Sequence, residues 1–243
     1  MWEPMKPAPP VTQTARDVMS SPLSGPGLHE ARPVERRFYQ RPTLIVARDL
    51  LGKLLVRELP QGIAVVRVAE VEAYLGISDP AAHTFAGRRT RRVAAMWGDG
   101  GHLYVYFTYG MHFCANVVTR RPGEPEAVLL RGAVAVAGRE HIAARRGGVP
   151  EARLLDGPAK LCQGLGIYRE LDGADLTTGG AIALVDDGLT IPDALVRRLR
   201  RVGVAYAGEA AAWPLRLLVN LGAPWPDEPR GARDEPGRGD AGR

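Results

Sequence analysis

The sequence predicts a single mixed α+β domain with a curved, largely antiparallel sheet and surrounding helices. Segments with the alternating, β-branched pattern of strands outnumber segments with helical periodicity. The two kinds do not alternate regularly along the chain, which disfavours a doubly wound parallel sheet. Residues 37–226 form a segment of 190 residues, long enough to build one continuous hydrophobic core.

Each predicted element depends on a local pattern. Residues 47–55 place apolar side chains at helical spacing and predict a helix that runs into a strand. Residues 63–74 and 103–108 alternate in the manner of strands. Further strands are expected at 127–136, 182–185 and 215–220, a short helix that begins with proline at 158–164, and either a strand or a basic helix at 194–202.

Both ends of the chain lack the pattern of a folded core. Residues 1–36 contain seven prolines and no periodic apolar pattern, so they cannot bury enough surface to offset the entropy lost on ordering. Residues 227–243 mix charges with glycine and proline and contain no large apolar side chain. We therefore expect a disordered N-terminal arm over 1–36, one folded domain over 37–226 and a disordered C-terminal tail over 227–243.

The charge balance and the cysteine count restrict the class of protein. The formal net charge is +5, the isoelectric point is near 9.5, and only three of the 32 basic residues are lysines. The positive excess falls in residues 37–226 and favours an anionic partner such as nucleic acid, although a genome rich in arginine codons would give the same composition. Two cysteines are too few for a disulfide framework, so a reducing compartment is expected. With no long apolar run, no membrane contact is expected and the protein should be intracellular.

The first group of candidate functional residues lies in the segment 68–76. If this segment is a strand, Glu70, Glu72 and Tyr74 project from one face because side chains alternate along a strand. One carboxylate could then act as a general base while the other adjusts its proton affinity. A surface strand can also carry Glu-x-Glu simply as solubilising charge. Spacing alone leaves open which glutamate would be the base.

Two further candidates follow that strand. His83 comes shortly after a turn at Asp79-Pro80, which would allow it to return to the same pocket. The run that follows consists of Arg88, Arg89, Thr90, Arg91 and Arg92. It is either a solvated charge run or a set of contacts to phosphate groups.

Aromatic residues are concentrated in one segment. Six of the 15 aromatic residues lie between Trp97 and Phe113. In a strand over 103–107, Leu103, Val105 and Phe107 would form an apolar face while Tyr104 and Tyr106 point to the other side. Tyr109-Gly110-Met111 predicts a tight protruding turn.

These tyrosines could be half-buried packing residues, as tyrosines in strands usually are. The alternative is a platform on which a nucleobase stacks, with a side chain at the tip of the turn placed to wedge between base steps. The sequence lacks the His-x-Glu and Pro-Cys-x-x-Cys pattern of zinc deaminases and the phosphate-binding loop of nucleotide hydrolases. No metal site is expected.

Taken together, several ordered motifs between residues 38 and 225 resemble the 3-methyladenine DNA glycosylase family of the alkyladenine (methylpurine) type. The motifs are Glu72-Ala73-Tyr74-Leu75-Gly76, Asp79-Pro80-Ala81-Ala82-His83, Leu103-Tyr104-Val105-Tyr106, Tyr109-Gly110-Met111-His112 with Asn116, Gly157-Pro158-Ala159-Lys160-Leu161-Cys162 and Arg201-Val202-Gly203-Val204-Ala205-Tyr206-Ala207-Gly208. One departure is Thr90-Arg91-Arg92-Val93, where the family pattern is Thr-Pro-Arg-Asn, so the shape of that loop is open.

The resemblance implies a role for each matching residue. Glu72 corresponds to the general base that activates water, which selects it over Glu70. The implied pocket residues are Tyr74 and Tyr106, which stack on the base, His83, which donates or accepts a hydrogen bond, Asn116, which discriminates against normal guanine, and Arg131, which lines the site. Tyr109, with Met111 beside it, corresponds to the residue that inserts into DNA.

The resemblance also implies an activity. It is that of a monofunctional, cofactor-free enzyme that flips alkylated or deaminated purines out of double-stranded DNA and hydrolyses the N-glycosidic bond in base excision repair. A monomer is expected, in the cytoplasm at the nucleoid of a bacterium or in the nucleus of a eukaryote. The alternatives are a non-catalytic protein that binds lesions and, more distantly, a sugar hydrolase that uses Glu70 and Glu72 as an acid–base pair.

Overall fold

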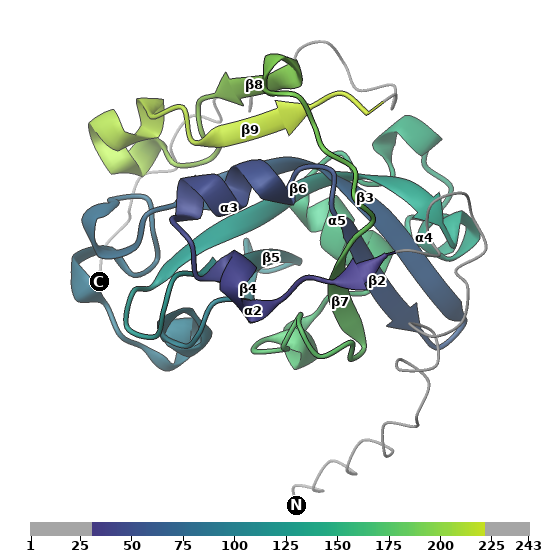
Figure 1. The fold of residues 1–243 in the computed structure, drawn as a ribbon, viewed down its shortest axis with the longest axis horizontal. Helices are drawn as coiled ribbons and strands as arrows, with labels where there is room; N and C mark the ends of the chain where they lie inside the picture. The colour runs from purple at the N-terminus through teal and green to yellow at the C-terminus, as the bar shows by residue number, and fades with distance from the viewer. Residues whose placement is uncertain (1–30, 222–243) are drawn as a thin grey trace, which may run out of the picture.

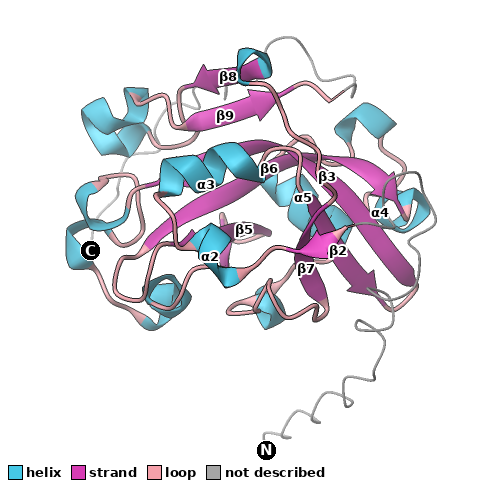
Figure 2. Ribbon diagram, in the orientation of Figure 1, coloured by secondary structure: helices cyan, strands magenta, loops and turns pink. Residues whose placement is uncertain are grey.

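The computed structural model describes residues 31–221, which form one antiparallel sheet with helices packed around it (Figures 1 and 2). Nine strands take part, in the order β1-β7-β2-β3-β6-β5-β4, and β9 pairs with β3 on one side and β8 on the other. Every pair of strands is antiparallel. The predicted α+β class with a curved, antiparallel sheet is therefore confirmed.

The strand β3 is the centre of this sheet. It runs alongside β2 in its first half and alongside β9 near its end, while β6 pairs with it on the other side over most of its length. The strands are β1 (Arg32–Pro33), β2 (Leu54–Leu59), β3 (Gly62–Tyr74), β4 (Leu103–Thr108), β5 (His112–Thr119), β6 (Glu126–Ala137), β7 (Ile182–Asp186), β8 (Val196–Leu199) and β9 (Arg216–Val219).

Four α-helices accompany the sheet among the described residues: α2 (Arg36–Tyr39), α3 (Thr43–Leu50), α4 (Arg139–Arg145) and α5 (Pro158–Leu165). Helix α3 packs against β3 and β6, and α5 packs against β5 and β6. Figure 1 shows α3 crossing in front of the long strands, with β8 and β9 beyond it. Short 3₁₀ segments form most of the remaining connections.

Several elements differ from the sequence-based expectation. The helix expected at 47–55 begins earlier, at Thr43, and ends at Leu50, because the following residues pair as β2. The ambiguous segment 194–202 contains the strand β8. Strand β5 and helix α4 were not predicted; in α4 only Ile142 is buried, so its apolar pattern is too weak to show in the sequence.

The expected boundary of the N-terminal arm falls inside the described residues, and there the structure differs from the prediction. Arg32 and Pro33 pair with β7, and Val34 is buried in the main core. The rest of the expected arm, residues 1–30, and the expected tail lie outside the described residues. Among residues 31–221 no helix has the length and hydropathy needed to span a bilayer.

A change of phase in β3 positions the candidate site residues. Before residue 69 the even-numbered side chains, Val66 and Val68, point into the main core, whereas after it the odd-numbered Val71 and Ala73 do so. The register with β6 shifts at the same place, where Ala69 has no partner in the ladder. Such a β-bulge adds one residue and reverses the side to which later side chains point. Without it, Glu70 and Glu72 would point into the hydrophobic core.

Strand β6 carries a matching irregularity. Its pairing with β3 passes from Gly132 directly to Leu130 and leaves Arg131 as the extra residue. The two bulges compensate, so the register after them is the same as before. One face of the sheet beyond this point carries Val71, Val105, Ala115 and Leu130 into the core, and the opposite face is free to build a site.

The predicted division of β4 is confirmed except at its end. Leu103 and Val105 belong to the main core, and Tyr104 belongs to a smaller cluster on the opposite face. Phe107, expected on the apolar face, is instead 39% exposed and packs against Phe113, because the strand extends past the core there.

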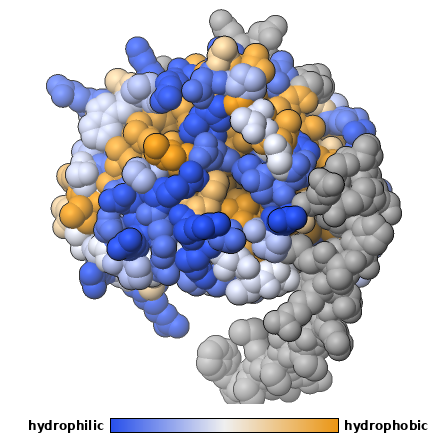
Figure 3. Space-filling model, viewed as in Figure 1, coloured by the Kyte–Doolittle hydropathy of each residue, from blue (hydrophilic) through white to orange (hydrophobic). Residues whose placement is uncertain are grey.

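On the face seen in Figure 3, hydrophilic side chains surround smaller apolar patches.

Candidate active site

A row of five side chains crosses the sheet on the face opposite the main core. The register places Tyr104 of β4 opposite Asn116 of β5, Asn116 opposite Leu129 of β6, Leu129 opposite Glu72 of β3, and Glu72 opposite Arg216 of β9. Directly opposite residues of antiparallel strands share one face. All five are buried. The antiparallel topology thus joins residues that are as much as 144 positions apart in the sequence (Glu72 and Arg216).

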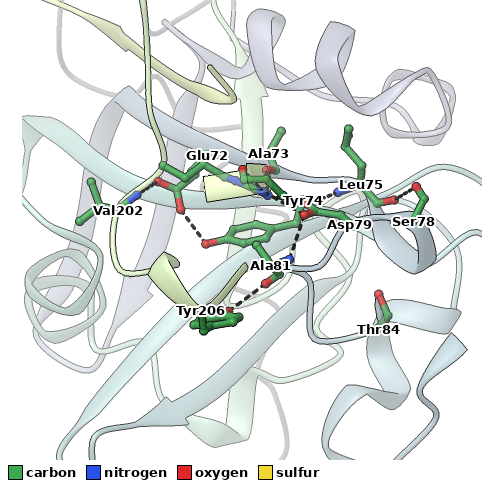
Figure 4. Close-up of polar contacts among 12 residues, drawn as sticks. Glu72, Ala73, Tyr74, Leu75, Ser78, Asp79, Ala81, Thr84, Val202 and Tyr206 are labelled. Carbon is green, nitrogen blue, oxygen red and sulfur yellow. Dashed lines mark hydrogen bonds and ion pairs between the residues drawn. The ribbon is translucent and has the colours of Figure 1, made fainter. Parts of the chain in front are cut away.

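Glu72 is fully buried, and each oxygen of its carboxylate accepts a hydrogen bond. Oε1 accepts a hydrogen bond of 2.6 Å from the Tyr74 hydroxyl, and Oε2 accepts one of 3.0 Å from the backbone N–H of Val202. Figure 4 shows the carboxylate between these two partners. Nη1 of Arg131 lies 3.2 Å from Oε2. Burial of a carboxylate is costly unless hydrogen bonds and opposite charge compensate it, and these three groups supply both.

Glu70 is linked to the same arginine. Its Oε1 accepts a hydrogen bond of 3.0 Å from Nε of Arg131 and another of 3.2 Å from Nη1 of Arg216. Burial acts to lower the pKa of Arg131, but the carboxylates of Glu72 and Glu70 outweigh it, so the pKa of Arg131 is raised. Arg131 therefore stays charged while it bridges the two glutamates.

An aromatic wall faces these charged groups. The rings of Tyr104 and Tyr106 are stacked with centroids 5.5 Å apart, and His83 meets Tyr106 edge-on at 4.6 Å. Nδ1 of His83 lies 2.9 Å from the Tyr104 hydroxyl. Burial raises the pKa of Tyr104 to about 12 and raises the pKa of Tyr106 as well. Both phenols are protonated at neutral pH and can donate hydrogen bonds.

His83 is uncharged at neutral pH. Burial, followed by the charges of Arg92 and Arg88, lowers the pKa of His83 from 6.5 to about 4. A neutral imidazole has one N–H donor and one acceptor nitrogen. Because the Tyr104 hydroxyl can donate to Nδ1, the ring can keep its own proton on Nε2.

A cavity of about 420 Å³ adjoins this face of the sheet. Tyr104, Asn116 and Leu129 of the row line it, whereas Glu72 and Arg216 do not. Its volume lies in the range of small-molecule sites. It is lined by Tyr74, Ala81, His83, Met96, Tyr104, Tyr106, Thr108, Tyr109, Cys114, Asn116, Ala127, Leu129, Arg131, Pro158, Val202, Gly203, Val204 and Tyr206. The structure thus brings together Tyr74, His83, Tyr106, Asn116 and Arg131, and all three groups that contact the Glu72 carboxylate line this cavity.

The predicted turn at 109–111 connects β4 and β5 and projects from the protein. Tyr109 is 80% exposed and Met111 is 69% exposed. The backbone φ is +51° at Tyr109 and +66° at Gly110. Positive φ is uncommon for a residue with a bulky side chain, so Tyr109 is held in a strained conformation. Tyr109 lines the cavity, whereas Met111 does not.

The residues of the arginine run, Arg88 to Arg92, are all exposed and lie outside the cavity wall. The guanidinium of Arg89 stacks on Trp97 at 3.8 Å from the ring centroid. Arg92 lies 5.5 Å from the centroid of Tyr106 and donates a hydrogen bond to the carbonyl of Phe107. Arg92 is therefore the member of the run that reaches the aromatic wall.

Four positions in or next to the site had no role assigned from the sequence. Asp79 and Arg201 form a fully buried ion pair next to Tyr74, Val202 donates its backbone N–H to Glu72, and Tyr206 lines the cavity. All four lie in motifs that the sequence analysis quoted. The contribution of Val202 comes from its backbone, and no side-chain pattern can reveal that. Among the described residues no group of three or more His, Cys, Asp or Glu side chains could hold a metal ion.

Comparisons with known proteins agree on the class. Residues 37–221 match the family model described as Methylpurine-DNA glycosylase (MPG). A Bdellovibrio bacteriovorus protein named "Putative 3-methyladenine DNA glycosylase" is 44% identical over 185 residues, which are 76% of this chain and 93% of the relative. Proteins with the same name from Methanocella arvoryzae and Carboxydothermus hydrogenoformans are 45% and 47% identical, over 75% and 70% of this chain and 90% and 87% of theirs.

Proposed function

Because the chain belongs to the methylpurine-DNA glycosylase family and is thereby a DNA glycosylase, we propose that it flips alkylated or deaminated purines out of duplex DNA and hydrolyses their N-glycosidic bond. The observation that carries the proposal is the fully buried Glu72 carboxylate, whose hydrogen-bond partners line an aromatic cavity of about 420 Å³. The substrate class includes 3-methyladenine, 7-methylguanine, hypoxanthine and etheno-adenine.

Glu72 acts as the general base in this proposal. A water molecule gives a proton to the carboxylate while its oxygen forms a bond to C1′ of the deoxyribose. The C1′–N bond breaks, and its electron pair leaves with the purine. On an alkylated purine that electron pair neutralises the positive charge of the ring, so the leaving group needs no further activation, and general base catalysis of about 10²- to 10⁴-fold is a reasonable share of the rate.

The neighbours of Glu72 keep it ready for this step. The Tyr74 hydroxyl and the Val202 N–H occupy one lone pair on each oxygen and fix the plane of the carboxylate. Arg131 places a positive charge 3.2 Å from Oε2 of the carboxylate. These groups hold the Glu72 carboxylate in place directly behind the cavity wall that they themselves form.

The aromatic residues bind the flipped base. Tyr74 and Tyr106 offer π faces to the purine, and an electron-poor alkylated ring is attracted to such faces. His83, neutral at physiological pH, supplies a hydrogen bond from its free ring nitrogen. Asn116, buried at the cavity wall and bonded to the carbonyl of Tyr104, occupies the space that the exocyclic amino group of normal guanine would need.

The remaining residues engage the DNA helix. Tyr109, at the tip of the exposed turn, inserts into the space that the flipped base vacates, and Met111 supports it from the same turn. The exposed side chains Arg88, Arg89, Thr90, Arg91 and Arg92 contact phosphate groups on the rim. One protein molecule acts on one base, so a monomer suffices.

No lyase step is proposed. Such a step would require an amine, most often that of a lysine side chain, to form a Schiff base with the deoxyribose. The part of the chain that the structure describes contains two lysines: Lys53 pairs with Asp186, and Lys160 pairs with Asp156. Neither lines the cavity. The product should therefore be an intact strand with an abasic site, which is cleaved only after treatment with alkali.

The test is single-turnover release of free base from duplex oligonucleotides that carry one hypoxanthine or one etheno-adenine, followed by methylated DNA. Wild type is compared with Glu72→Gln and with the control Glu140→Gln, whose side chain is exposed on α4. We expect release by wild type and the control, and lesion binding without release by Glu72→Gln. Tight lesion binding by wild type without any release would favour the alternative of a non-catalytic lesion-binding protein.

A further inference from the structure

Glu70 is the buried acidic residue at the site that the proposed mechanism leaves without a role. It lies two residues before Glu72 on β3 and is 8% exposed. Its two partners are arginines from different strands, Arg131 of β6 and Arg216 of β9. A solubilising surface glutamate would face water, so this residue needs another explanation.

The contact with Glu70 restricts the orientation of Arg131. A guanidinium group is planar, and its nitrogens point in fixed directions. Nε of Arg131 is bound to Glu70 at 3.0 Å, and Nη1 reaches Glu72 at 3.2 Å. With Nε held, the guanidinium can turn little, and Nη1 is directed toward Oε2 of Glu72. Removal of the Glu70 carboxylate would free the Arg131 side chain to tilt.

Arg216 completes a balanced set of charges. Its backbone lies opposite Glu72 in the ladder, yet its guanidinium contacts Glu70 at 3.2 Å. Its side chain is 8% exposed, and its buried Nε has no hydrogen-bond partner among the described residues. Two carboxylates and two guanidiniums thus lie together in a buried region. Replacement of a buried ion pair by apolar residues often leaves stability unchanged, so stability alone does not explain the set.

We propose that Glu70 and Arg216 form a positioning pair that orients Arg131 and sets the electrostatic balance at Glu72. The inference rests on the proposed role of Glu72 as general base. The negative charge of Glu70 offsets part of the positive electrostatic potential that Arg131 produces at Glu72. Arg216 in turn offsets part of the negative charge of Glu70. The pair contacts neither the flipped purine nor the attacking water, and it acts on Glu72 through Arg131.

Other groups also face Glu72 and remain constant in the test. They are the hydroxyl groups of Tyr74, Tyr106 and Tyr206, the thiol of Cys114 and the N–H of Val202. The phenols and the thiol have pKa values raised by burial, so they stay neutral over the pH range in which a carboxylate titrates. Only the charges of Glu70 and Arg216 distinguish the variants described next.

The experiment measures the pH dependence of single-turnover base release by Glu70→Gln, Arg216→Gln and Arg216→Lys. Glu70→Gln removes a negative charge near Glu72, which favours the ionised base. The low-pH side of its profile of rate against pH, here called the acidic limb, should therefore move to lower pH by about one unit. Its maximal rate should fall about tenfold, because the general base is weaker and Arg131 is less well oriented. Arg216→Gln removes a positive charge and should move the acidic limb to higher pH. Arg216→Lys keeps the charge and should leave the limb within a few tenths of a unit of wild type.

The double variant Glu70→Gln/Arg216→Gln is the control for loss of folding. It removes one charge of each sign, so the net charge near Glu72 equals that of wild type. Its acidic limb should return close to that of wild type. Shifts of Glu70→Gln and Arg216→Gln in the same direction, or the absence of a shift in both, would overturn the proposal. A purely structural role would lower the rate and the melting temperature of these variants without opposite shifts in pH.

A second measurement separates this inference from the proposed function. The side-chain carboxyl ¹³C signal of Glu72, assigned with the Glu72→Gln variant, is titrated by NMR in the absence of DNA. The same opposite displacements in Glu70→Gln and Arg216→Gln are expected there, and they do not depend on turnover. Normal base release by Glu72→Gln would refute the role of Glu72 as base, whereas an unmoved Glu72 titration in both charge variants would refute the positioning pair.

Discussion

Asp79 and Arg201 form an ion pair in which both side chains are completely buried, with two hydrogen bonds of 2.5 and 2.9 Å between them. Asp79 also accepts hydrogen bonds from the backbone N–H groups of Leu75 and Ala81, and Arg201 donates to the carbonyls of Ala73 and Ala210. The pair thereby ties the loop after β3 to the segment that contains Val202, and these are the two sides of the Glu72 site (Figure 4).

The first prediction concerns the stability that depends on this pair. Asp79→Asn leaves the Arg201 charge buried without compensation, so the free energy of unfolding should fall by about 3 to 5 kcal/mol. Urea denaturation followed by circular dichroism measures the change. The matched control is Glu151→Gln, which breaks the exposed pair with Arg139 and should cost less than about 1 kcal/mol. Equal effects of the two substitutions would contradict the prediction.

The second prediction concerns pH and His83. The pKa of His83 is about 4 in the folded protein, below the ordinary value of 6.5. The unfolded chain therefore binds more protons than the folded protein between these values. The stability contributed by His83 is fully present above about pH 6.5 and is lost as the pH falls toward 4, with a slope of up to about 1.4 kcal/mol per pH unit.

The measurement for His83 is the free energy of unfolding between pH 4 and 7 for wild type and His83→Gln. The slope should be smaller in the variant, which has no imidazole to protonate. His112→Gln is the control, because His112 is exposed on β5 and the substitution should leave the slope unchanged. A variant slope equal to that of wild type would mean that His83 is not held neutral by its surroundings.

The third prediction separates function from strain at Tyr109. The residue has a φ of +51° and an 80% exposed side chain. Glycine adopts this conformation without cost, so Tyr109→Gly should leave stability unchanged or raise it by up to about 1 kcal/mol. Without the ring, the flipped state loses its support, and base release from duplex DNA should fall about tenfold or more.

Tyr109→Phe is the matched control, because it keeps the ring and the strain and should release base at nearly the rate of wild type. Thermal unfolding and single-turnover release are measured on all three proteins. If the glycine variant released base as fast as wild type, insertion of Tyr109 would not contribute to flipping.

The fourth prediction concerns the exposed arginine run. Each phosphate contact releases counterions, so the loss of one contact reduces the slope of log K against log salt concentration by about 0.9. Arg91→Gln should weaken binding to undamaged and damaged duplexes equally and reduce that slope by about one. Arg139→Gln on α4 is the control, and no change in its salt slope is expected. A loss confined to lesion DNA would instead place Arg91 in base recognition.

The fold class and most strands could be predicted because their cause is local. Alternation in β3 and β4 and the proline at the start of α5 depend on neighbouring residues, and these elements appear where the patterns place them. Helix α4 and the pairing of β1 with β7 could not be predicted in the same way. The short β1 is held by a strand about 150 residues away in sequence, and α4 buries one large side chain, so neither leaves a strong periodic pattern.

In the candidate site, too, some features follow from local sequence and others only from the pairing of distant strands. Alternation alone placed Glu70, Glu72 and Tyr74 on one face, and the family motifs selected Glu72 as the base. The partners of these residues follow only from the pairing of strands. Arg216 reaches Glu70 because β9 pairs with β3, and the N–H of Val202 reaches Glu72 because a buried ion pair holds its loop.

By itself, then, the sequence determined the α+β class, the residue types of the pocket and the family to which they belong, since these depend on composition, periodicity and ordered motifs. The tertiary structure alone decided which way the two glutamates point. Unbroken alternation from Val66 and Val68 would have carried both into the hydrophobic core, and the extra residue at Ala69 reverses that direction while the one at Arg131 restores the register with β6. A bulge requires two paired strands, so it is a property of the ladder and cannot be read from either strand alone.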